Sequence, residues 1–255
     1  MRMRALLLGL LILTGCVTTN ETVFTNQESP ELALKKRVEL ARAYIGQGNW
    51  ENAKRNLKLA ADIDPKNAEV YEAFALVYQS TGELEAAEEN FRRALSLNGA
   101  LSRARNNYAV FLFAQGRFAE AEKELEIVVR DTLYSGRPQA FTNLGLCRIR
   151  LQKNDAAIEA LERALTMEQL NPLALFNLAE LYYERQSFAK AQQFYQAYRK
   201  AVRTPTAGAL WLGIRLARSL ELSDERASLE LALYNMYPNS IEAKAAKNLS
   251  GSSER

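Results

Sequence analysis

A repeat of 34 residues is the feature of this chain that most restricts its fold. Large apolar residues recur at fixed distances from a small residue, so each period is expected to form two amphipathic helices joined by a short turn. The small residue lets the two helices approach closely, and the spacings between successive copies are 34, 34, 36, 34 and 34 residues. The small residues at this one equivalent position are Ala41, Ala75, Ala109, Gly145, Ala179 and Gly213.

The pattern within one period resembles the tetratricopeptide (TPR) repeat. In the first period, residues 34–67, Leu40 and Ala41 take positions 7 and 8 of a 34-residue unit, and Pro65 takes position 32. Proline at this place ends the second helix, because it lacks an N–H and clashes with the preceding turn. The sequence therefore predicts an all-α superhelical array of about six TPR units. The predicted units are 34–67, 68–101, 102–137, 138–171, 172–205 and 206–239.

Two departures from the period predict irregular places in the array. Two extra residues in the segment VVRDTLYSGRPQAF predict a longer loop between the third and fourth units. In the sixth unit the small residue Ala227 is displaced by two, so we expect a longer turn between the two helices of that unit. Residues 240–255 are expected to form a short capping helix and a tail.

The N-terminal segment has the order of a secretory signal. Arg2 and Arg4 precede a short apolar run, and the run ends in Leu-Thr-Gly-Cys16, which resembles the lipobox of bacterial lipoprotein precursors. The resemblance implies a signal peptide at 1–15, cleavage before Cys16, and fatty acyl chains such as palmitate on that residue. Val17, rather than Asp, then favours the outer membrane, facing the periplasm. Residues 16–33 are expected to form the lipidated N-terminus and a tether. The alternative interpretation of Cys16 is an ordinary cysteine near a cleavage site.

Composition weighs against an enzyme and against nucleic-acid binding. The chain has 33 Lys and Arg, two of them before Cys16, against 30 Asp and Glu, so the mature protein is nearly neutral. It has no histidine, which removes the commonest general base and zinc ligand. No catalytic residues, metal ligands or cofactor are predicted. Cys147 is interpreted as a small buried apolar residue.

The first helix of each unit is expected to line the concave face, and three consecutive units place asparagine at one inward position: Asn107, Asn143 and Asn177. An amide can donate and accept at once, so this ladder would suit an extended peptide held by its main chain. The alternative is packing or hydrogen bonding between neighbouring helices. Apolar residues expected around the ladder, which would mark a partner site, are Val110, Phe113, Leu146, Ile149, Phe176 and Tyr183.

Three segments carry a more specific resemblance: NNYAVFLFAQGRFAEAE at 106–122, DTLYSGRPQAFTNLGLCRIRL at 131–151 and LWLGIRLAR at 210–218. With the lipobox, they resemble the type IV pilus biogenesis and stability lipoproteins, the pilotins of the pilus secretin. The resemblance implies a monomer that binds secretin subunits and promotes their outer-membrane localisation and multimerisation, and hence pilus-dependent motility. Acyl chains on Cys16 would provide the membrane contact. The alternative is a TPR lipoprotein scaffold for another envelope machine, for outer-membrane protein insertion or peptidoglycan synthesis.

Overall fold

The computed structural model describes residues 29–251, and within them the chain forms α-helices and no strands. The all-α prediction is confirmed. The predicted signal peptide, Cys16, most of the predicted tether and the last four residues lie outside the described residues. The helices are α1 (Pro30–Gly46), α2 (Trp50–Ile63), α3 (Ala68–Thr81), α4 (Leu84–Leu97), α5 (Ser102–Ala114), α6 (Phe118–Val128), α7 (Arg137–Arg150), α8 (Asn154–Met167), α9 (Pro172–Glu184), α10 (Phe188–Ala201), α11 (Ala207–Ser219), α12 (Ser223–Met236) and α13 (Ile241–Gly251).

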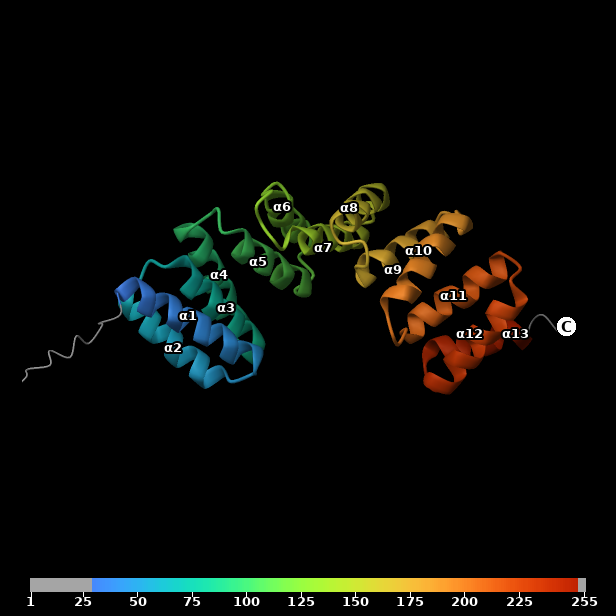
Figure 1. Cartoon of the computed structure of the whole chain (residues 1–255), viewed down its shortest axis with the longest axis horizontal. Helices are drawn as coiled ribbons and strands as arrows, with labels where there is room; N and C mark the ends of the chain where they lie inside the picture. The colour runs from blue at the N-terminus through green and yellow to red at the C-terminus, as the bar shows by residue number, and fades with distance from the viewer. Residues whose placement is uncertain (1–28, 252–255) are drawn as a thin grey trace, which may run out of the picture.

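Successive helices pack in pairs, from α1 with α2 to α11 with α12, and each pair packs on the next. The pairs follow one another along a curved array, with α6 and α8 on the outer side of the arch and α5 and α7 on its inner side (Figure 1). The last helix, α13, contacts both α11 and α12 and covers the apolar surface of the final pair. This arrangement is the superhelical TPR array that the period predicts.

Local sequence explains where the helices begin and turn. Side chains such as Ser29, Asn171 and Thr206 cap helix N-termini by accepting a backbone N–H. Within the first three pairs the turn is made by a glycine with positive φ, as at Gly82, where φ is 81°. The later pairs place a longer residue there, as at Gln152 with φ of 59°, although side chains disfavour this conformation.

The small residue shared by the repeats lies where the two helices of a pair meet. Ala41, Ala75 and Ala109 are fully buried there. At the glycine positions even a methyl group has no room. A Cβ on Gly145 would lie 2.6 Å from Leu161 Cγ, and a Cβ on Gly213 would lie 2.1 Å from Tyr195 Oη. The period therefore marks close approaches between helices, within one pair at Gly145 and between consecutive pairs at Gly213.

The longer loop between the third and fourth helix pairs is present at residues 129–136. Side-chain hydrogen bonds hold this loop at both ends. Ser102 Oγ donates to Asp131 Oδ2 at 2.5 Å, and Arg137 Nε donates to the Val129 carbonyl at 2.7 Å. The backbone N–H of Leu133 donates to Asp131 Oδ1, and the Leu133 side chain itself is 94% exposed.

The prediction of a longer turn in the last unit is wrong. The link between α11 and α12 has three residues, the same number as the link between α9 and α10. The extra residue lies instead in the part of α11 that follows the small residue Gly213. The positive-φ residue Glu221 comes eight positions after Gly213, whereas Gln186 comes seven after Ala179. The displaced Ala227 is exposed on α12, so it does not act as the buried small residue expected in the second helix of the unit.

Candidate functional site

The three asparagines of the predicted ladder lie on α5, α7 and α9, but their side chains have different partners. Asn107 Nδ2 donates to Glu72 Oε1 on α3 at 2.6 Å. Asn143 Nδ2 donates to Asn106 Oδ1 on α5 at 3.2 Å. Asn177 Nδ2 donates within its own helix, to the Leu173 carbonyl at 2.7 Å. Two of the three amides therefore join consecutive repeats, which favours the alternative of inter-repeat hydrogen bonding for Asn107 and Asn143.

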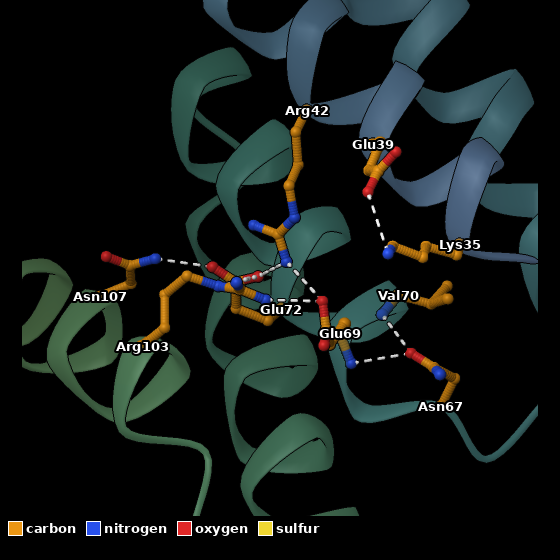
Figure 2. A network of polar contacts seen from close by, with 9 residues as sticks. All are labelled: Lys35, Glu39, Arg42, Asn67, Glu69, Val70, Glu72, Arg103 and Asn107. Carbon is orange, nitrogen blue, oxygen red and sulfur yellow. Dashed lines mark hydrogen bonds and ion pairs between the residues drawn. The ribbon is translucent and has the colours of Figure 1, made fainter. Parts of the chain in front are cut away.

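Glu72 is a buried carboxylate that the sequence analysis does not predict as part of a site. Its side chain is fully buried and faces Arg42 Nη2 from α1, Arg103 Nε from α5 at 3.6 Å, and the Asn107 amide (Figure 2). Glu69 completes the cluster, at 2.7 Å from Arg103 Nη2. A buried carboxylate is tolerated when it is paired and hydrogen-bonded in this way. Opposite charges at equivalent positions of successive repeats, as at Glu69 and Arg103, are the signal that would have found it.

An apolar pocket of about 190 Å³ opens between α5 and α7. The structure brings four of the predicted site residues together at it and adds three others. Val110 is 41% exposed, so one wall of the pocket is accessible to solvent. The lining residues are Ala109, Val110, Phe113, Leu125, Asn143, Leu146 and Cys147.

Cys147 lies on the inner wall of this pocket with 1% of its surface exposed. Burial raises the pKa of its thiol to about 12, and the charge of Glu122 adds to the increase. The thiol is therefore protonated at neutral pH and is a poor nucleophile. This fits a residue that shapes the pocket rather than one that reacts.

The remaining predicted apolar residues, here termed the second apolar area, lie on α7 and α9 outside the pocket. Ile149, Phe176 and Tyr183 are partly buried against the core that α8 to α11 share. The Arg215 guanidinium lies 4.7 Å from the centre of the Tyr183 ring. Arg215 Nη2 also lies 3.8 Å from Glu180 Oε1, which lies on the same helix as Tyr183.

The pKa of Glu180 is raised above its ordinary value, mainly by burial. The positive charge of Arg215 opposes the shift, and the negative charge of Glu184 adds to it. A partly desolvated carboxylate thus borders the second apolar area.

Arg150 is the last residue of α7. Its guanidinium carbon is 5.8 Å from the centre of the Phe113 ring and 5.9 Å from that of Phe118. The two rings meet edge to face at 5.0 Å. Because Phe113 also lines the pocket, this cation lies beside the pocket.

Residues 29–251 contain no group of three or more His, Cys, Asp or Glu side chains placed to hold a metal ion. In the same part of the chain, no helix combines the length and the apolar character needed to cross a membrane. The features that the described surface does offer are an apolar pocket, a second apolar area and the charged groups beside them. Together these suit contact with another protein.

The paired helices define a tetratricopeptide-repeat protein, and comparison with known families agrees. Models described as "Tetratricopeptide repeat" match residues 37–67, 78–132 and 142–206. The chain is similar to the type IV pilus assembly protein PilF of Pseudomonas aeruginosa (strain PAO1), with 36% identity over 245 residues, which cover 95% of this chain and 97% of that protein.

Two solved structures have the same architecture over most of this chain. That of Pseudomonas aeruginosa PilF has a TM-score of 0.83 and 34% identity, and the match covers 86% of this chain and 98% of that one. That of PilW, described as a widely conserved type IV pilus biogenesis factor, has a TM-score of 0.73 and 26% identity over 83% and 97% of the two chains. The chain belongs to the PilF/PilW family of type IV pilus biogenesis factors.

Proposed function

We propose that this chain is an outer-membrane lipoprotein that acts as a pilotin. It binds subunits of the type IV pilus secretin, brings them to the outer membrane and promotes their assembly into a ring. The observation that carries the proposal is the 36% identity to the type IV pilus assembly protein PilF over nearly the whole of both chains. The partner would be a protein segment, and the chain would act without a cofactor.

The inner surface of the arch supports this proposal as the binding face. The pocket between α5 and α7 and the second apolar area over α7 and α9 lie on successive first helices, so one extended segment could contact both. Val110 on α5 is exposed, and Tyr183 on α9 is partly buried. Apolar contact of this kind supplies most of the energy of protein association, while flanking charges set orientation.

The proposed anchor on Cys16 would act through concentration rather than through a new contact. One acyl chain binds a bilayer only marginally, whereas two or more hold a protein stably. A lipid-anchored groove raises the effective concentration of its bound cargo at the membrane. Binding by the groove and delivery by the anchor would therefore be separable by mutation.

The experiment is to measure secretin in outer-membrane fractions of cells that carry or lack this chain. Loss of secretin multimers, with monomers left in the inner membrane, is the expected result. Complementation with Cys16→Ser should leave secretin binding intact but fail to restore the outer-membrane rings. Normal rings in the absence of the chain would contradict the proposal and favour a scaffold for another envelope machine.

A further inference from the structure

The cation beside the α5–α7 pocket, Arg150, differs from three arginines on other first helices of the array. Arg42 and Arg103 are paired with Glu69 and Glu72, and Arg215 with Glu180. Over residues 29–251, by contrast, no carboxylate comes within 4 Å of the Arg150 guanidinium, whose contacts are the faces of two aromatic rings. Arg150 is also exposed. Its charge is therefore positioned but not neutralised.

The pocket beside this cation matches one apolar side chain in size. Its volume of about 190 Å³ exceeds the roughly 150 Å³ of an engineered protein cavity that binds benzene. Six of its seven lining residues are apolar or thiol side chains, and Asn143 is the exception. The Asn143 Oδ1 already accepts from Gln139 Nε2, and the Asn143 Nδ2 donates to Asn106 Oδ1. A side chain that enters the pocket thus meets an apolar wall without an unsatisfied partner.

We propose that the α5–α7 pocket and Arg150 form a recognition site for a partner segment that carries an apolar side chain with a carboxylate two residues away. The inference deepens the proposed function, since it names the chemistry of the segment that the inner surface would hold. Because the positive charge of Arg150 is not neutralised, it favours an acidic residue in the partner segment.

The spacing follows from the geometry of an extended chain. Residues i and i+2 of a strand point to the same side and are about 6.6 Å apart. The Arg150 guanidinium carbon lies 5.8 Å from the centre of the Phe113 ring, which forms part of the pocket wall. An apolar side chain in the pocket would therefore place the carboxylate of a residue two positions away within reach of Arg150.

The test uses the full chain in lipid nanodiscs and two synthetic peptides. The first is acetyl-Asp-Gly-X-Gly-Asp-Gly-amide, in which X is a leucine analogue with a photoreactive diazirine side chain. The matched peptide carries Asn at both Asp positions, and acidic residues on both sides of X allow for either chain direction. Adducts formed on illumination are located and quantified by mass spectrometry.

We expect adducts to concentrate on the pocket residues of α5 and α7, with a yield about threefold higher for the Asp peptide, as an exposed ion pair provides. The ratio should fall to about one in Arg150→Gln and be partly restored in Arg150→Lys. Val110→Glu should reduce adducts from both peptides. Leu40→Glu, at a residue of equal exposure on α1, should change neither. Circular dichroism checks that each variant keeps its helicity and melting temperature.

Adducts spread evenly over the surface, or an Asp preference that survives Arg150→Gln, would overturn the inference. The peptide result is read independently of the secretin. A chain that captures the Asp peptide in the pocket but does not affect secretin rings would retain this site and lose the proposed function. A chain that assembles rings but does not discriminate the peptides would lose this site alone.

Discussion

Glu72 of α3 and Asn107 of α5 join two consecutive repeats through a hydrogen bond of 2.6 Å, and the carboxylate that accepts it is fully buried. In a repeat array, stability is approximately the sum of the stabilities of single repeats and of the interfaces between neighbours. This hydrogen bond therefore contributes to the stability of the interface between two neighbouring repeats. It also uses an amide at the position where the sequence alone suggests a peptide-binding ladder.

Asn107→Ala should lower the free energy of unfolding by about 1–2 kcal/mol, because it removes one of the hydrogen bonds that satisfy a buried carboxylate. Asn177→Ala should change it by less than about 0.5 kcal/mol, since that amide bonds only to its own helix among the described contacts. Equilibrium urea unfolding followed by circular dichroism measures both. Equal effects of the two changes would show that the inter-repeat bond is not stabilising. Of the ladder, Asn177 is thus the cleaner position at which to test partner binding.

Gly213→Ala and Gly145→Ala should each destabilise the chain by about 1–3 kcal/mol, because the added methyl group would overlap Tyr195 or Leu161 and force two neighbouring helices apart. Thermal unfolding gives the effect. Gly46→Ala is the matched control, because no other group lies within 4 Å of the added Cβ. It should leave stability unchanged or slightly increased. Tyr195→Phe should relieve part of the Gly213→Ala penalty, and strictly additive effects would contradict the proposed clash.

Glu180→Gln should alter how stability depends on pH. The raised pKa means that, above the pKa of about 4.3 of an unfolded glutamate, folded Glu180 keeps a proton that the unfolded chain has released. Stability contributed by this group is therefore present at low pH and is lost as pH rises through the folded pKa. The variant should therefore lose less stability than the native chain as the pH rises above about 4.3. Parallel curves from urea unfolding across this range would contradict the raised pKa.

Cys147 should resist alkylation in the folded chain. With its pKa near 12 and its side chain buried, almost no accessible thiolate exists at pH 8. In a Cys16→Ser background, iodoacetamide should modify Cys147 at least about a hundred times more slowly than in guanidinium chloride, where the thiol has its ordinary pKa near 8.5. Mass spectrometry of quenched samples gives the rates. Similar rates in both conditions would show that the pocket opens readily.

The sequence predicts the repeat architecture well because small residues such as Ala75 and Ala109 have to recur wherever paired helices touch. It also locates the long loop at 129–136, since two inserted residues break the period. It does not predict the turn of the last pair, because the period cannot tell whether an extra residue lies in the helix or in the link. Only the backbone conformation of Glu221 shows that it lies in α11.

The candidate site is predicted less completely. Position within the repeat identifies Val110 and Leu146 as inward residues, and both line the pocket. It cannot identify the partner of Asn107, because Glu72 lies 35 residues earlier and contacts α5 only when the repeats stack. For the same reason, stacking decides that Arg150 contacts two aromatic rings rather than a carboxylate.

The proposed function requires that the inner surface of the arch binds the pilus secretin. This binding is measured as the affinity of the full chain, immobilised through its C-terminus, for the purified periplasmic part of the secretin from the same cells. We predict saturable binding that weakens at least about tenfold, or 1.4 kcal/mol, in Val110→Glu and is unchanged in Leu40→Glu. No saturable binding, or equal affinity in the two variants, would contradict the account.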